Sequence, residues 1–395
     1  MNSKIKNLKF LIVFISIVLF NSCDKVDSIL TPPIVSRGEI VSVSLQKNYT
    51  PQDIQAIGFP FLISFNIKAY KIVYKTIDGS GNEILASGAI LIPQKPDSLA
   101  TVFHSHGTAF RKVDGAASEL GSSINEAFLF AGTGLVIIFP DYLGFGASKN
   151  MFHPFHIQKY YASNGVDLYR AAKKFFRDSS IKLNGKNFLM GYSEGGYATL
   201  SLQKEIEKNY SNEIKLTAVA AAAGAYSLTE TSKYLVGSAK LNYPAYVAYV
   251  FMSYKKFYNL SYSYNQIFNE PYASRLDSLF DGNYSGGDLN RSLNYNTDSL
   301  LSKNFITGFL GNDFTDIKNN FSENNLIDWK PIAPLRLFHG ENDITVPYLN
   351  SVLAFDSFKS KGSNVSFATP TTGTRDHTGS AIYWFYDTAA WFATF

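Results

Sequence analysis

The sequence predicts an α/β protein with a mainly parallel central sheet, helices on both faces and an inserted helical cap. Short, almost continuously apolar segments alternate with longer stretches in which apolar residues recur at helical steps. Such apolar segments are typical of parallel strands that are covered on both faces. A gap in this alternation, from residue 227 to residue 328, predicts the cap.

The first 22 residues differ from the rest of the chain. Lys4, Lys6 and Lys9 precede the apolar run FLIVFISIVLF (10–20), which is too short to span a bilayer and is typical of a secretory signal. The run leads into LFNSC, which resembles the lipobox of bacterial lipoproteins and would make Cys23 a lipidated first residue. We therefore expect export and a lipid anchor in a bacterial membrane, in particular the outer membrane. The alternative for Cys23 is an incidental free thiol.

Composition and charge bound the remaining chain. The 395 residues are 46% hydrophobic and 17% charged, which suits one large folded domain. Removal of residues 1–22, with three lysines and no acid, lowers the formal net charge from +4 to +1. A nearly neutral body argues against nucleic acid as a partner.

The polar residues 23–51, with two adjacent prolines, are expected to be a tether. The core is then expected to comprise residues 52–226 and 329–395. It begins with two apolar segments, 69–77 and 83–93, that flank the turn-rich DGSGN and predict an antiparallel hairpin.

The strands of the parallel part follow the hairpin, and they are expected at residues 100–107, 134–142, 186–193, 215–224, 335–340 and 365–370. Between the second and third of them, Val166, Tyr169, Ala172 and Phe176 recur at helical steps. In sheets of this type, functional sites form at the carboxyl ends of the strands.

Residues 227–328 contain no clear core strand and are rich in Tyr, Asn, Ser and Phe. A stretch of this length is too long for a structureless loop inside a folded domain. We expect an inserted, largely helical cap over the strand ends.

One serine lies on the turn between a predicted strand and a predicted helix. Gly191, Tyr192, Ser193, Glu194 and Gly195 match the pattern G-x-S-x-G in the context that this motif requires. The glycines let the backbone turn sharply, which raises the Ser193 hydroxyl above the sheet. Ser193 is therefore the candidate nucleophile.

Several motifs occur in an order that resembles the α/β-hydrolase superfamily: the hairpin, HGT (106–108), PDYLGFGAS (140–148), GYSEGG (191–196), HGENDITVP (339–347) and DHTG (376–379). HGT, DYLGFG followed by HPF, and GYSEGG are similar to the secreted lipase and carboxylesterase branch. The resemblance covers roughly residues 60–395. It implies hydrolysis of carboxylic esters through an acyl-serine, without a cofactor.

A serine nucleophile needs a base, and the base needs an orienting acid. In the superfamily the chain order is serine, acid, histidine, and His377 is the one histidine that follows the last predicted strand. Asp343 lies three residues beyond Gly340, on a loop expected to face Ser193. Glu341 and Asp376 are the alternative acids.

The developing oxyanion needs preorganised donors, and we expect the backbone N–H groups of Thr108 and Glu194 to supply them. The pairs HSH (104–106) and HPFH (153–156) have spacings that would suit metal ligands, but neither has a clear third ligand. We therefore expect no metal. His106 is expected to support the oxyanion loop, and His339 to pack in the core.

The leading prediction is a serine hydrolase that acts on small-molecule or lipid esters. The first alternative is a serine peptidase of the prolyl type, whose cap would need a carboxylate such as Glu270, Asp277 or Asp281 to hold a substrate amine. The second alternative is a non-catalytic surface lipoprotein that uses the fold for binding.

Overall fold

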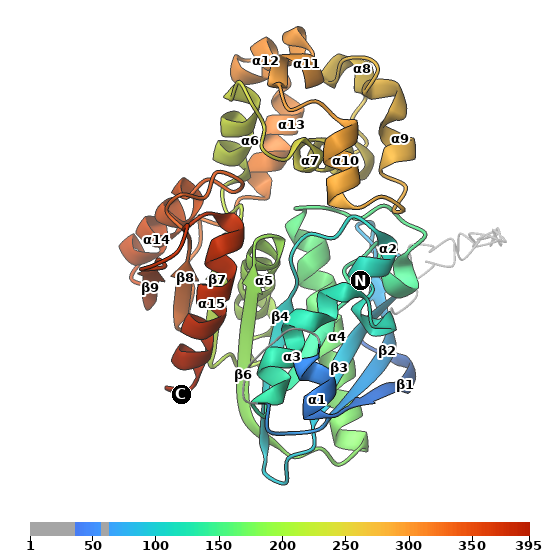
Figure 1. Cartoon of the computed structure of the whole chain (residues 1–395), viewed down its shortest axis with the longest axis vertical. Coiled ribbons are helices and arrows are strands. Elements are labelled where there is room, and N and C mark those ends of the chain that lie inside the picture. The colour runs from blue at the N-terminus through green and yellow to red at the C-terminus, as the bar shows by residue number, and fades with distance from the viewer. Residues whose placement is uncertain (1–35, 57–62) are drawn as a thin grey trace, which may run out of the picture. The chain divides into compact units, whose positions relative to one another are not determined.

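The computed structural model describes residues 36–56 and 63–395 of the chain. Within these residues, nine strands form one sheet in the spatial order β1-β2-β3-β5-β4-β6-β7-β8-β9 (Figure 1). The strands are β1 (Ile40–Tyr49), β2 (Ile67–Ile77), β3 (Glu83–Pro93), β4 (Leu99–Ser105), β5 (Val136–Pro140), β6 (Leu183–Tyr192), β7 (Ala218–Ala222), β8 (Leu335–Phe338) and β9 (Val365–Ala368).

The sheet has an antiparallel and a parallel part. Strands β1, β2 and β3 pair antiparallel, as do β3 and β5. From β5 through β4, β6, β7 and β8 to β9, every pair is parallel. The carboxyl ends of the parallel strands therefore meet at one edge of the sheet.

Side chains that alternate along the strands enter two separate cores, one on each face. Leu189 and Val219 belong to one core, whereas Phe188 and Met190 belong to the other. The first core also receives side chains from α4 (Gln158–Asp178), α5 (Glu194–Glu205) and α14 (Leu349–Ser360). The second receives them from α3 (Asn125–Gly132) and α15 (His377–Phe392). Helices thus lie on both faces (Figure 1), which confirms the predicted fold class.

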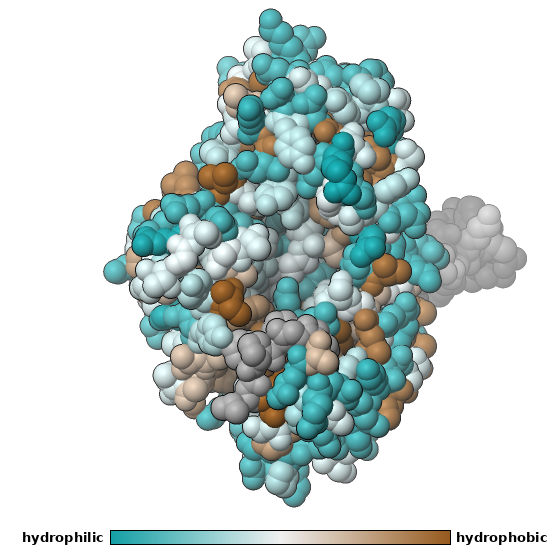
Figure 2. Space-filling view, in the orientation of Figure 1, coloured by the Kyte–Doolittle hydropathy of each residue, from teal (hydrophilic) through white to brown (hydrophobic). Residues whose placement is uncertain are grey.

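Eight helices lie between β7 and β8 and are gathered together in Figure 1. They are α6 (Leu228–Gly237), α7 (Pro244–Phe257), α8 (Tyr264–Ile267), α9 (Leu276–Leu279), α10 (Gly286–Ser292), α11 (Thr297–Leu300), α12 (Lys303–Leu310) and α13 (Thr315–Glu323). The described surface is hollowed below these helices (Figure 2). Two further short α-helices are α1 (Pro51–Gln55) and α2 (Lys112–Gly115), and a π-helical turn, Ile206–Tyr210, follows α5.

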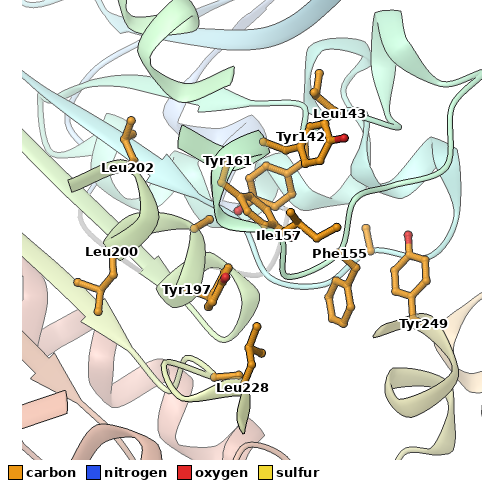
Figure 3. Close-up of a cluster of buried hydrophobic side chains, with 14 of the residues drawn as sticks. Tyr142, Leu143, Phe155, Ile157, Tyr161, Tyr197, Leu200, Leu202, Leu228 and Tyr249 are labelled. Carbon is orange, nitrogen blue, oxygen red and sulfur yellow. The ribbon is translucent and has the colours of Figure 1, made fainter. Parts of the chain in front are cut away.

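Two tyrosines of α7 hold the helix group against the core. Tyr249 of α7 stacks on Phe155, with ring centroids 4.8 Å apart (Figure 3). The hydroxyl of Tyr254, five residues further along α7, donates a hydrogen bond of 2.9 Å to the carbonyl oxygen of His156. Both contacts reach the loop that precedes α4, so the loop HPFH couples the inserted helices to the sheet.

The expected tether of residues 23–51 is wrong for residues 40–49, which form β1 and pair with β2. This strand lies at the edge of the sheet, and Tyr49 is its one buried residue. Both of its faces are exposed to solvent, so the strand accommodates polar residues such as Gln46, Lys47 and Asn48. The sequence of the segment is therefore polar. The alternation of Ile40, Val41 and Val43 with serines was the available signal.

The signal segment 1–22 and Cys23 lie outside the described residues. Among the residues that are described, no helix has the length and apolar character needed to cross a bilayer.

Candidate active site

The nucleophile turn is closed too tightly for side chains on its glycines. Ser193 joins β6 to α5 with φ 60° and ψ −124°, a conformation that is strained for a residue other than glycine. A Cβ on Gly191 would collide with the carbonyl of Gly195, and one on Gly195 would collide with the carbonyl of Ser105. The two glycines are therefore what allows Ser193 to stand at the strand end.

The structure brings Ser193, His377 and Asp343 together from three separate segments. Ser193 Oγ lies 2.9 Å from His377 Nε2, and His377 Nδ1 lies 2.5 Å from Asp343 Oδ2. His377 is the first residue of α15, and its carbonyl accepts a 2.6 Å hydrogen bond from the hydroxyl of Tyr192. The residue before the nucleophile therefore also fixes the start of the helix that carries the histidine.

Asp343 is buried and strongly hydrogen-bonded. Its Oδ1 accepts from the backbone N–H groups of Thr345 and Val346, at 2.9 and 3.0 Å. Burial alone would raise the pKa of Asp343, but hydrogen bonds from His339 and His377 outweigh it and lower the pKa to about 2. The carboxylate is therefore ionised at neutral pH and can orient His377.

His339 does more than pack. Its Nε2 lies 3.0 Å from Asp343 Oδ2 and 3.0 Å from the carbonyl oxygen of Val346. Both of these atoms accept, so Nε2 carries the proton, and Nδ1 accepts from the Ser351 hydroxyl at 2.8 Å. The spacing of four residues between His339 and Asp343 gave no signal of this contact, because both residues lie on the loop that follows β8 and not in a helix.

The structure gives the two alternative acids other partners. Glu341 pairs with Arg375 at 2.6 Å, with both side chains partly exposed. Asp376 caps α15 and accepts from the N–H of Gly379 at 2.7 Å. Neither carboxylate has a hydrogen bond to His377 among the described contacts, so Asp343 is the acid that the geometry favours.

Thr108 and Glu194 line the same cavity as Ser193. Glu194 is the first residue of α5, where backbone N–H groups have no partner within the helix. Thr108 follows His106, whose carbonyl accepts a 2.8 Å hydrogen bond from Tyr142 and whose ring stacks on the Tyr142 ring at 4.0 Å. Both residues thus lie on the wall of the cavity that contains Ser193, and the contacts of Tyr142 hold the segment before Thr108 in place.

The side chain of Glu194 has partners that the sequence analysis missed. It is buried, and its Oε1 lies 2.8 Å from His153 Nε2 and 2.8 Å from the hydroxyl oxygen of Tyr161. The ring of His153 is therefore in contact with a buried carboxylate. His104 lies among aromatic rings, including Phe139 at 5.0 Å, and its Nε2 is 3.6 Å from Glu126 Oε2.

The described residues contain no group of three or more His, Cys, Asp or Glu side chains placed to share a metal ion. The two histidine pairs of the sequence have the separate surroundings given above.

The cavity above Ser193 is apolar, and its empty space, including the part that is open to solvent, is about 570 Å³. Its walls come from the core and from α6, α7 and α13, and they include Leu228, Leu235, Tyr246, Val250 and Phe321. His156 also lines it, and burial lowers the pKa of His156 to about 4, so this imidazole is neutral near pH 7. Such walls suit an uncharged, apolar group.

The carboxylates that an aminopeptidase would need do not line this cavity. Asp277 is exposed and pairs with Lys256 at 2.8 Å. Glu270 accepts from Asn265, and Asp281 from Asn283, at 2.7 and 2.9 Å. The three cap carboxylates that the sequence offered for a substrate amine are thus absent from the described lining of this cavity.

Comparison with known proteins indicates the family and the fold of the chain. The family model described as secretory lipase matches residues 124–393. The structure is similar to the rice cell wall degrading esterase LipA from Xanthomonas oryzae, with 28% identity and a TM-score of 0.79 over 90% of this chain and 96% of that one. No curated protein matches the chain significantly.

Two further structures share the fold at lower identity. A hydrolase from Legionella pneumophila is 24% identical, with a TM-score of 0.82 over 90% of this chain and 98% of that one. Candida antarctica lipase A in its closed state is 16% identical, with a TM-score of 0.68 over 90% of this chain and 82% of that one.

Proposed function

The chain belongs to the secretory lipase family and is an ester-cleaving hydrolase, and from this premise we propose that it acts through an acyl-serine formed on Ser193. The family indicates export of the protein. The observation that carries the proposal is the continuous hydrogen-bonded chain from Ser193 Oγ through His377 to Asp343.

In the first half of the reaction, His377 Nε2 takes the proton of the Ser193 hydroxyl as Oγ attacks the ester carbonyl carbon. The Asp343 carboxylate accepts from Nδ1–H and stabilises the imidazolium. The carbonyl oxygen becomes an oxyanion, to which the N–H groups of Glu194 and Thr108 donate. His377 then gives the proton to the leaving alcohol oxygen as the C–O bond breaks, which leaves the acyl group on Ser193.

In the second half, water replaces the alcohol. His377 removes a proton from the water, the resulting hydroxide oxygen attacks the acyl carbon, and the same N–H groups stabilise the second oxyanion. The proton returns to Ser193 Oγ as the acyl bond to the serine breaks. The carboxylic acid leaves, and the site returns to its starting protonation state.

The apolar cavity supports esters with an apolar acyl group, whether small molecules or lipids. Leu228, Leu235 and Val250 offer aliphatic walls beside Ser193, and each buried methylene of an acyl chain gains about 0.8 kcal/mol. We assign residues 227–328 the role of a cap, because α6, α7 and α13 supply much of this wall.

For the location of the enzyme, the proposal is a lipid anchor on Cys23 in the outer membrane of a bacterium. Its support is the basic and apolar signal that ends in LFNSC. Replacement of Cys23 by Ser should release the protein from the membrane fraction. Continued sedimentation of the variant with membranes would contradict the anchor.

The activity is tested with nitrophenyl esters of increasing acyl length beside a prolyl nitroanilide. Ser193→Ala should abolish ester cleavage. Ser232→Ala is the matched control, because this hydroxyl lies in the same cavity but donates to Thr229 in its own helix. Cleavage of the anilide alone would indicate a peptidase, and no cleavage of either would favour a binding protein.

A further inference from the structure

A buried ion pair lies directly behind the nucleophile turn, and the reaction described above does not use it. His153 Nε2 and Glu194 Oε1 are 2.8 Å apart, and each side chain is 1% exposed. Burial of two charges is costly, and a pair of this kind often adds nothing to stability compared with apolar side chains. Its place next to Ser193 therefore calls for a functional explanation.

Hydrogen-bond partners indicate the protonation of the pair. His153 Nδ1 lies 2.7 Å from the carbonyl oxygen of Leu143, which can only accept. Nε2 faces Glu194 Oε1, which also accepts from the Tyr161 hydroxyl at 2.8 Å. Burial would raise the pKa of Glu194, but the charge and hydrogen bond of His153, together with smaller contributions from His106 and His156, outweigh it and lower the pKa. The pair is therefore an imidazolium with a carboxylate.

The carboxylate is held from two elements outside its own helix. His153 comes from the loop before α4, and Tyr161 comes from α4 itself. Glu194 Oε2 has no hydrogen-bond partner among the described residues, so Oε1 carries all the hydrogen bonds of the carboxylate. Removal of His153 would leave the Tyr161 hydroxyl as the single remaining anchor.

The side chains around Glu194 also contact the second segment of the oxyanion site, the one that leads to Thr108. The ring of Tyr142 lies 5.7 Å from that of His153 and 5.0 Å from that of Tyr161. Its hydroxyl holds the carbonyl of His106, two residues before Thr108. The segments that present both N–H donors are thus packed against one set of side chains.

We propose that His153 is a positioning residue for the oxyanion site and acts through the Glu194 carboxylate. The inference rests on the proposed function. His153 fixes the first turn of α5, and it also neutralises a carboxylate that would otherwise repel the negative oxygen forming beside the backbone N–H of Glu194. In a buried site with a low effective dielectric constant, such repulsion between close charges is large.

The test uses the full chain with His153→Gln, Glu194→Gln and the double variant. It measures kcat and KM for a nitrophenyl ester, together with the affinity for a trifluoromethyl ketone whose tetrahedral adduct has an oxyanion. For His153→Gln we expect kcat and ketone affinity to fall by the same factor, about 10- to 100-fold, with KM unchanged. The double variant should recover activity relative to His153→Gln, because no unpaired carboxylate remains.

A pH profile separates positioning from a general loss of structure. In His153→Gln, the unpaired Glu194 should take up a proton as the pH falls from 7 to 5, so that kcat relative to wild type rises. The double variant should lack this rise. The other titratable groups that face Glu194 are His106 and His156, whose pKa values burial lowers, and the tyrosines 142, 161, 246 and 249, whose pKa values burial raises.

Tyr161→Phe keeps the test decisive if His153→Gln does not fold. It removes one donor to Glu194 and keeps the ring, so kcat and ketone affinity should both fall a few-fold. Tyr169→Phe is the matched control, because Tyr169 is a buried tyrosine of the same helix whose hydroxyl donates to Asn187. It should leave both values unchanged.

The proposal is overturned if folded His153→Gln keeps wild-type kcat, or if kcat falls while ketone affinity stays constant. It is also overturned if Tyr161→Phe behaves like Tyr169→Phe. Failure of the proposed function is a different result, because Ser193→Ala would then retain ester cleavage in the same assay.

Discussion

His377 Nε2 lies 2.9 Å from Ser193 Oγ, although 184 positions separate the two residues in the chain. Ser193 follows β6, and His377 begins the helix after β9. The parallel strands bring these two ends to the same edge of the sheet. Their contact is therefore a product of the sheet topology, and each residue is held by its own rigid element.

This contact predicts the effect of removing either partner. Ser193→Ala and His377→Ala should each lower kcat for ester cleavage by on the order of 10⁴-fold or more, because the hydroxyl and the base act as one unit. The double variant should be no slower than the slower single variant. Steady-state kinetics on folded proteins tests this, and additive losses would show that the two residues do not act together.

Removal of the negative charge should lower kcat far more at Asp343 than at Glu341. Asp343→Asn should lower kcat by roughly 10⁴-fold, because the amide no longer fixes the tautomer of His377. Glu341→Gln should leave kcat nearly unchanged, because Glu341 forms a partly exposed pair with Arg375. A larger loss in Glu341→Gln than in Asp343→Asn would reassign the acid.

Asp343 should also contribute to the pH dependence of stability. Its pKa in the folded protein, about 2, lies below the value near 3.9 of an unfolded chain. The stabilisation is therefore complete above about pH 4 and is lost as the pH falls from 4 to 2, and it amounts to on the order of 2 kcal/mol. Urea unfolding at pH 5 and pH 2.5 should show the gap between wild type and Asp343→Asn narrowing by this amount. An unchanged gap would mean that the carboxylate is not stabilised by its partners.

The cavity walls predict a change in acyl preference. Val250→Trp should fill part of the space above Ser193, so that kcat/KM falls most for the longest nitrophenyl ester and least for the acetate. Leu310→Trp is the control, because Leu310 lies on the cap helix α12 and is 48% exposed. Equal losses for all chain lengths would place the acyl group elsewhere.

The parts of the fold that were predictable are those in which local sequence and tertiary structure agree. The residues before Ser193 form an apolar run because β6 is buried on both faces from Phe188 to Tyr192, and this run predicts the strand and the turn after it. Strand β1 was not predicted, because both of its faces are solvated. Polar residues such as Gln46 and Lys47 therefore do not destabilise it, and the segment lacks the apolar pattern of a buried strand.

The candidate site was predictable where it follows motifs and chain order, as for Ser193, Asp343 and His377. The roles of His153 and His339 could not be predicted from the sequence. The contact of His153 with Glu194 spans 41 positions and depends on how the loop before α4 packs against α5. The environment of His339 depends on Ser351 in α14. Such contacts exist only after the elements have packed.

The insertion of α6 to α13 between β7 and β8 has a consequence for folding. Ala218–Ala222 can pair with Leu335–Phe338 only after more than a hundred intervening residues have been made. Pairing over such a distance slows folding, and until it occurs one edge of the alanine-rich strand β7 is open to other chains. Asp343 and His377 both lie after β8 in the sequence. During synthesis, Ser193 is therefore made well before the histidine that would activate it.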